Sequence, residues 1–140
     1  MTDDVYLDVS DANGAAFFSR GVTGPVVMLN LLRFRDVADY TEFPELAPEQ
    51  PISGRQAYQR YIDHAKPYVE AAGGRVLFLG EGGGYLIGPE GEGWDFAMLV
   101  EQGSPEAFLA FASNEGYLAG IGHRTAAVYD SRILPLIESK

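Results

Sequence analysis

Short apolar runs bounded by glycine or proline recur along the chain. Residues 25–34 (PVVMLNLLRF) form a continuous apolar stretch with a proline at its edge, and this length suits a strand buried on both faces better than a helix. Similar runs occupy residues 75–81, 94–102 and 125–136. The glycine-rich stretch between the second and third runs indicates a hairpin, in which residues 85–87 have the composition of a further short strand. The pattern therefore predicts four main strands.

The clearest helical pattern lies in residues 53–74. Ser53 and Gln56 have the spacing of a capping box, and a glycine pair ends the stretch. Pro67 removes one backbone donor and is expected to bend the helix. An apolar stripe runs along one side and consists of Tyr58, Tyr61, Ala65, Val69 and Ala72.

A second helix is predicted after residues 94–102. Ser104 and Pro105 stand at its N-cap and first helical position, and a weaker helical pattern with three glycines follows in residues 115–123. The order is strand, helix, two strands, helix, strand. This order predicts an α+β, ferredoxin-like βαββαβ fold with a four-stranded antiparallel sheet.

The length of 140 residues suits one domain. Residues 1–24 are expected to form an N-terminal extension with a brief helix capped by Ser10 or Asp11, and residues 25–140 the single ferredoxin-like domain. Two helices cover only one face of such a sheet. Because the first and third strands are apolar on both sides, we predict a homodimer in which the uncovered sheet faces pack together.

Composition and net charge restrict the classes of partner that the protein is expected to bind. Twenty acidic and ten basic residues give a net charge of −10, which argues against nucleic acid and against anionic membrane surfaces. No apolar segment has a membrane-spanning length, and the start MTDDVYLD lacks the basic and apolar regions of a secretory signal. The chain has no cysteine, hence neither disulfides nor thiolate chemistry. A cytoplasmic protein is expected.

Several sequence pieces within residues 22–136 resemble a known family. They include PVVMLNLLRFR and the paired signatures WD…LVE…SPEAF and HRTAA…DSR. Their pattern is similar to domain of unknown function 1330 (DUF1330), an uncharacterised bacterial family of the dimeric α/β-barrel superfamily. The resemblance implies a dimeric α/β barrel with a pocket between the sheet and the helices or loops of each subunit. That superfamily includes cofactor-free monooxygenases, polyketide cyclases, muconolactone isomerases, haem-processing enzymes and non-catalytic stress proteins, so the resemblance does not name a reaction.

Charged and amide side chains interrupt two of the predicted strands. Two-residue alternation places Asp130 and Arg132 on one face together with Val128, so the two opposite charges are expected to pair. Either they form a structural ion pair, or Arg132 binds an anionic substrate group or oxyanion while Asp130 orients it or a histidine. Asn30 lies in the adjacent first strand. Its buried side-chain amide needs a hydrogen-bond partner, which is either a substrate carbonyl or Asp130.

Both histidines are candidate proton carriers. His123 and Arg124 are placed in a glycine-flanked loop before the last strand, where a functional role and a helix-capping role are both open. His64 shares a helical stripe with Tyr61 and borders the apolar face that contains Tyr58. It is either a general base beside phenols or a residue packed at a helix edge.

Other candidates are weaker. Asp95 and Glu101 share one face of the third strand but lie roughly 20 Å apart, too far to act on one atom, so Glu101 alone is left to reach a pocket. Trp94 fits a core or dimer contact better than a stacking platform for a substrate. GEGGGY lacks the spacing of a phosphate-binding loop, and no metal-binding motif is present. We therefore expect neither a cofactor nor a metal.

The leading hypothesis is a cofactor-independent acid/base enzyme, of isomerase, cyclase or monooxygenase type, acting on an apolar or aromatic carbonyl, phenol or carboxylate. The alternatives are a non-catalytic dimeric binding or stress-related protein, and a module that pairs with a separate enzyme. The candidate catalytic residues are His64, His123, Arg124, Asp130 and Arg132. The candidate substrate-binding residues are Asn30, Tyr58, Tyr61, Trp94 and Glu101.

Overall fold

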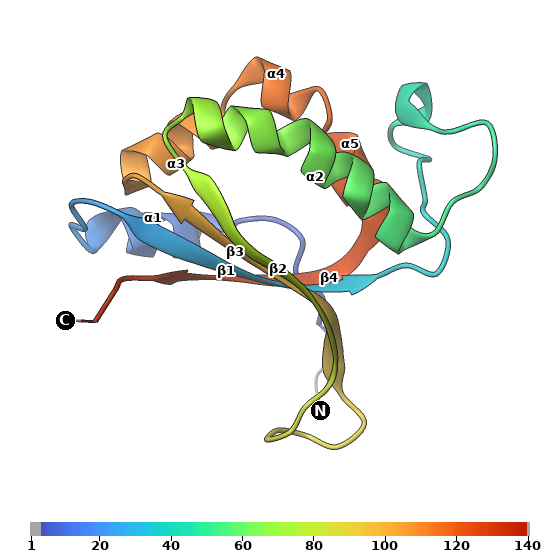
Figure 1. The fold of residues 1–140 in the computed structure, drawn as a ribbon, viewed down its shortest axis with the longest axis horizontal. Helices are drawn as coiled ribbons and strands as arrows, with labels where there is room; N and C mark the ends of the chain where they lie inside the picture. The colour runs from blue at the N-terminus through green and yellow to red at the C-terminus, as the bar shows by residue number, and fades with distance from the viewer. Residues whose placement is uncertain (1–3, 140) are drawn as a thin grey trace.

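The centre of the molecule is a four-stranded antiparallel sheet (Figure 1). The computed structural model describes residues 4–139. The strand order is β2-β3-β1-β4, so the first and last strands are neighbours. With the helices between the strands, this order is the α+β ferredoxin-like arrangement, which confirms the predicted fold class. The strands are β1 (Val26–Phe34), β2 (Arg75–Gly84), β3 (Gly93–Gln102) and β4 (Val128–Leu136).

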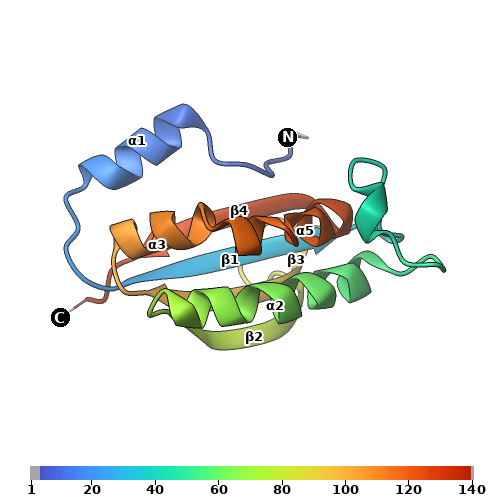
Figure 2. The ribbon, with the colours of Figure 1, turned by 90° about the horizontal axis from the view of Figure 1, so that it is seen from above.

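A layer of helices covers one face of this sheet (Figures 1 and 2). The longest helix begins after Ser53, whose capping box with Gln56 is formed as predicted, and Ser104 caps the next helix. Among the described residues, no helix is both long and apolar enough to cross a membrane. The helices of this layer are α2 (Gly54–Ala71), α3 (Pro105–Ala112), α4 (Glu115–Leu118) and α5 (Ile121–Ala127).

The N-terminal segment runs outside this layer. Its helix α1 (Asp11–Ser19) is capped by Ser10, one of the two predicted candidates, and lies beyond the β4 edge of the sheet (Figure 2). No residue of α1 is buried, and its Phe17 ring meets Phe108 of α3 at 6.5 Å between centroids. The segment between β1 and α2 contains one 3₁₀ turn, η1 (Pro44–Leu46).

Two sequence-based boundaries are wrong. β4 begins at Val128, because residues 125–127 complete α5 instead of starting the strand. There the Ala127 carbonyl accepts a hydrogen bond from the Arg35 backbone N–H at 2.8 Å, which ties the end of α5 to the chain leaving β1. Residues 85–87 are not a strand but part of the turn that joins β2 to β3.

A β-bulge in β4 changes which residues share a face. Two consecutive residues at the end of β1 pair with Val128 and Asp130, so Tyr129 is the extra residue. Asp130 and Arg132 do share a face, as predicted. The predicted sharing with Val128 is wrong, because the bulge shifts the alternation by one residue and turns Val128 toward the helices.

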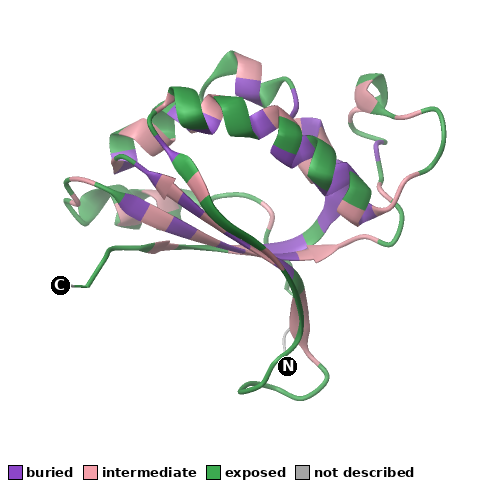
Figure 3. Cartoon of the chain, in the orientation of Figure 1, coloured by how far each residue is buried: buried purple, intermediate pink, exposed green. Residues whose placement is uncertain are grey.

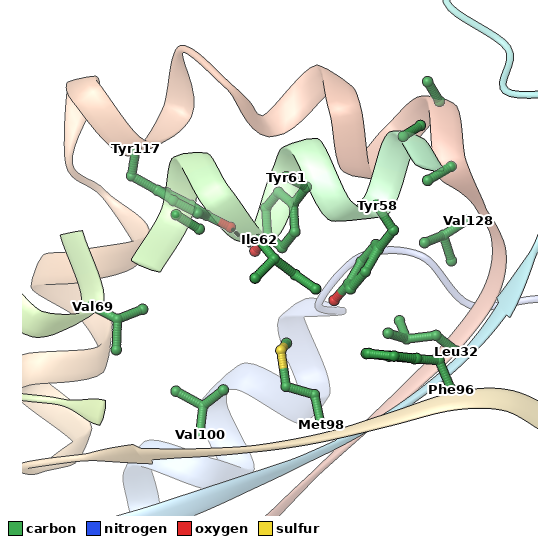
Figure 4. Packing of buried hydrophobic residues seen from close by; sticks show 14 of the residues in the cluster. Leu32, Tyr58, Tyr61, Ile62, Val69, Phe96, Met98, Val100, Tyr117 and Val128 are labelled. Atoms are coloured by element: carbon green, nitrogen blue, oxygen red, sulfur yellow. Dashed lines mark hydrogen bonds between the residues drawn. The ribbon is translucent and has the colours of Figure 1, made fainter. Parts of the chain in front are cut away.

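The core lies between the sheet and the helices. Figure 3 shows the buried positions on the facing sides of both layers, and Figure 4 shows how their side chains interdigitate. Among the sheet residues, Leu32 and Phe96 are almost fully buried. The α2 side chains packed over the sheet include Tyr58, Tyr61, Ile62, Ala65 and Val69.

The opposite face of the sheet has no helix over it among residues 4–139 (Figure 1). The pairing register places a row of apolar side chains there, and two of them, Leu134 and Leu136, are 56% and 38% exposed. We call this surface the open face. Its apolar residues are Val27, Leu29, Leu31, Phe78, Ala97, Leu99, Leu134 and Leu136.

Candidate functional site

A buried carboxylate organises the polar end of the open face. The Asp130 side chain is 2% exposed and accepts hydrogen bonds from Arg132 Nη1 at 2.6 Å and Arg33 Nη1 at 2.8 Å. The Tyr6 backbone N–H donates a third at 3.0 Å. Burial alone opposes the charged carboxylate, but these hydrogen bonds and the two guanidinium charges outweigh it, so the pKa of Asp130 is lowered. The group carries two positive charges and one negative charge at neutral pH.

Aromatic rings flank both guanidinium groups. Arg33 Cζ lies 3.9 Å from the centre of the Trp94 ring, and Arg33 Nε donates to the Gly93 carbonyl at 2.7 Å. Arg132 Cζ lies 4.7 Å from the Tyr6 ring and 5.2 Å from the Trp94 ring. Contacts of this kind attract the guanidinium cation to the ring electrostatically and fix the orientation of the guanidinium plane. Trp94 is therefore a stacking platform for arginines rather than a core residue.

The arginines line an open groove of about 1240 Å³. Its walls are the β2–β3 hairpin on one side and the ends of β1 and β4 on the other, with Asp4 and Val5 of the N-terminal segment. Trp94 Nε1 donates to the Tyr85 hydroxyl at 2.7 Å, which ties the turn of the hairpin to β3. The hairpin extends to the side of the sheet away from the helices (Figure 1).

Arg132 is the cation best placed for a ligand. Its side chain is 40% exposed, whereas that of Arg33 is 20% exposed. Within the described chain, its hydrogen bonds to Asp130 and to the Ser131 carbonyl all use Nη1. Nε and Nη2 therefore remain available to an anionic group in the groove.

The two histidines lie in the helical layer and not at this groove. His64 Nε2 donates to the Gly116 carbonyl at 2.8 Å, and its ring packs so closely on Gly120 that a Cβ there would clash. His123 belongs to α5, not to the predicted loop, and its Nδ1 lies 2.7 Å from the Tyr40 hydroxyl. Burial, followed by the positive charge of Arg60, lowers the pKa of His123. Both histidines therefore lie in the helical layer, but each is hydrogen-bonded to a different partner.

Arg124 and Asn30 also serve internal contacts. Arg124 donates to the Leu7 carbonyl at 2.9 Å and to Ser131 Oγ at 3.2 Å, so it binds the N-terminal segment rather than lining the groove. Asn30 Nδ2 donates to the Met28 carbonyl at 3.1 Å on the helix-covered face. The predicted bridge from Asn30 to Asp130 is wrong, because the two side chains lie on opposite faces of the sheet.

The remaining candidates are separated from the groove. Tyr58 is 1% exposed in the core, and the Tyr61 hydroxyl bonds the Tyr117 hydroxyl at 2.7 Å (Figure 4). Burial raises the pKa of all three phenols. Glu101 accepts from Arg75 Nε at 3.0 Å at the opposite end of β3 from Trp94.

The sequence prediction missed Arg33 and Tyr85 as groove residues, and it missed Tyr6 as a contact of Asp130 and Arg132. Arg33 carried a signal: it is a charge in an apolar strand next to the strand that holds Asp130. Tyr6 and Tyr85 carried none. The path of the N-terminal segment brings Tyr6 to Asp130 and Arg132, and the curl of the hairpin brings Tyr85 to the groove. No set of three or more potential metal ligands converges within residues 4–139.

Comparison with known proteins identifies close structural relatives. No protein-family model matches the chain, and no curated protein matches it. The crystal structure of the methylated RPA0582 protein is 33% identical, with a TM-score of 0.84 over 97% of this chain and 96% of that one. A second structure of RPA0582, described as a protein of unknown function from Rhodopseudomonas palustris, is 33% identical with the same TM-score over 98% and 99%. A DABB family protein from Mesorhizobium loti is 14% identical, with a TM-score of 0.48 over 84% and 100%.

Proposed function

The chain belongs to the family of the RPA0582 protein from Rhodopseudomonas palustris, and from this premise we propose that it is a cytoplasmic small-molecule-binding protein whose ligand occupies the groove beside Arg132. We also propose that this family is DUF1330, on the signatures within residues 22–136. The observation that carries the function is the Nε/Nη2 edge of Arg132 at an open groove, which donates no hydrogen bond to residues 4–139.

The Arg132 edge of the groove favours a small anion with an apolar or aromatic body. Asp130 neutralises one of the two guanidinium charges, and the carboxylates of Asp4, Glu90, Glu92 and Asp95 also line the groove. The positive charge offered to a ligand carboxylate is therefore confined to the Nε/Nη2 edge of Arg132. A charge-assisted hydrogen bond to that carboxylate is worth about 1.5–3 kcal/mol. The rings of Trp94 and Tyr85 supply the apolar wall for the rest of the ligand. An aromatic monocarboxylate has both properties.

Binding without catalysis is better supported than acid/base catalysis. A general base must reach the proton it removes within about 3 Å or through one water. His64 and His123 are hydrogen-bonded within the helical layer, whereas the groove opens at the other face of the sheet. The alternative from the sequence, a dimeric binding protein, is therefore our proposal.

We place the homodimer interface on the open face. Its apolar row would otherwise stay in water, at a cost of about 25 cal/mol per Å² of exposed apolar area. The hairpin supports the same arrangement, because Leu86 and Ile87 at its tip are 100% and 93% exposed and the hairpin extends on that side (Figure 1). Two sheets that pack face to face would cover both surfaces.

The test uses the chain's single tryptophan as the reporter. Benzoate is titrated into the protein while Trp94 fluorescence is followed, with benzamide as the neutral isostere. We expect saturable quenching by benzoate, about tenfold weaker binding by benzamide and by Arg132→Gln, and no change in Arg75→Gln. Absence of a fluorescence or melting-temperature response to benzoate, phenylacetate and cinnamate would overturn the proposed function.

A further inference from the structure

We propose that residues 4–9, which we call the strap, position Arg132 for its ligand, so that docking of the strap and binding in the groove strengthen each other. This inference rests on the proposed function. It goes beyond it by assigning the N-terminal extension a role in the site.

The strap adds to the free edge of β4 through backbone hydrogen bonds. The Ser131 backbone N–H donates to the Tyr6 carbonyl at 2.9 Å, and Ser131 Oγ donates to the same oxygen at 2.6 Å. Arg124 Nη1 donates to the Leu7 carbonyl from the helical layer at 2.9 Å. These contacts fix the path of the strap next to the residues that form the groove.

Two contacts connect the strap to Arg132 directly. Oδ1 of Asp130 accepts from both the Tyr6 backbone N–H and Arg132 Nη1, at 3.0 and 2.6 Å. The Tyr6 ring lies 4.7 Å from Arg132 Cζ. Undocking of the strap would remove one of the two rings near the guanidinium and one donor from the carboxylate that orients it. Arg132 would then sample other rotamers and lose preorganisation.

The strap can undock without unfolding the domain. Its hold includes the hydrogen bonds above and the packing of Leu7 against the core, and the α1 helix that follows has no buried residue. Segments with few buried apolar contacts open at a small fraction of the global unfolding free energy. Because linkage is reciprocal, a ligand that needs an ordered Arg132 favours the docked strap by the same factor.

The experiment measures strap docking and ligand affinity separately in the full-length protein. Ser131→Ala removes the hydroxyl that donates to the Tyr6 carbonyl and accepts from Arg124 Nη2. It leaves every groove side chain in place, because Ser131 does not line the groove. Leu7→Ala weakens the packing of the strap against the core but keeps the Tyr6 ring beside Arg132, and it is the second strap variant if Ser131→Ala leaves the strap docked. Ser113→Ala, at the exposed end of α3, is the matched control.

We expect faster amide exchange of residues 4–9 and about fivefold weaker benzoate binding in the strap variants, with neither change in the control. Saturating benzoate should slow exchange of the strap by the same factor in the wild type. Benzoate binding that is unchanged while strap exchange accelerates would overturn the inference and leave the proposed function standing. Absence of benzoate binding to the wild type would overturn both.

Discussion

Asp130 and Arg132 are joined at 2.6 Å on the same face of β4, at the end where the strap and the groove meet. Asp130 also holds Arg33, so one buried carboxylate compensates two cations from neighbouring strands. A charge network of this kind fixes the positions of its members, and it also makes the stability of the domain depend on the carboxylate.

Asp130→Asn should strongly destabilise the protein. The substitution keeps the shape of the side chain but leaves two guanidinium groups without their counter-charge. The two arginines are partly exposed, so water offsets part of the loss, and the expected cost is about 1–3 kcal/mol, measured by urea unfolding. The matched control is Glu101→Gln, which breaks an exposed pair with Arg75 and should cost less than about 1 kcal/mol. Equal losses in both variants would contradict the central role of Asp130.

The same carboxylate predicts an acid-dependent loss of stability. The pKa of Asp130 in the folded protein is below its ordinary value of 3.8, so the unfolded chain binds the proton more readily. The stabilisation is therefore present above pH 3.8 and is lost as the pH falls through the lower folded-state pKa. The difference in unfolding free energy between wild type and Asp130→Asn should be largest at pH 7 and should shrink below pH 3.8. A difference independent of pH would show that Asp130 is not charged when folded.

The features of the fold that could be predicted depend on residues that are close together in the sequence. The capping box of Ser53 and the Ser104-Pro105 start specify helix beginnings within a few residues, and they formed as predicted. Pairing of Asp130 with Arg132 followed from alternation alone. The extra residue Tyr129 could not be foreseen, because a bulge depends on the register between strands.

The composition of the groove depended on longer-range arrangement. The position of Arg33 opposite Asp130 required the β1–β4 register, and Tyr6 required the path of the strap. The histidines were misjudged for a similar reason. Helical periodicity placed His64 at the edge of an apolar stripe. It could not predict that the His64 ring would bond the Gly116 carbonyl and pack on Gly120.

His123 should titrate below the ordinary histidine range. Its pKa is lowered below 6.5 by burial and then by the charge of Arg60, so the imidazole stays neutral at pH 7. Arg60→Gln should move its NMR titration midpoint upward, toward 6.5, whereas Arg55→Gln should leave it unchanged. A midpoint that does not move in Arg60→Gln would rule out the charge effect.

The open face predicts how the dimer can be broken. Leu134→Glu places a charge in the middle of the apolar row and should shift the protein to monomers in sedimentation equilibrium at micromolar concentration. Leu118→Glu provides the control, since Leu118 is similarly exposed, at 44%, but belongs to α4 on the helical side. Dissociation by the control alone would place the interface on the helices.

Tyr61→Phe tests whether the buried phenol pair is structural. Tyr61 and Tyr117 share one hydrogen bond of 2.7 Å inside the core, and removal of one hydroxyl leaves the other without that partner. An unsatisfied buried hydroxyl costs about 1–3 kcal/mol, whereas removal of both hydroxyls leaves no orphan. The double variant Tyr61→Phe/Tyr117→Phe should therefore be more stable in urea than the sum of the two single losses predicts. Additive losses would mean that each hydroxyl finds another partner, such as water entering the core, and that the pair does not hold α2 to α4.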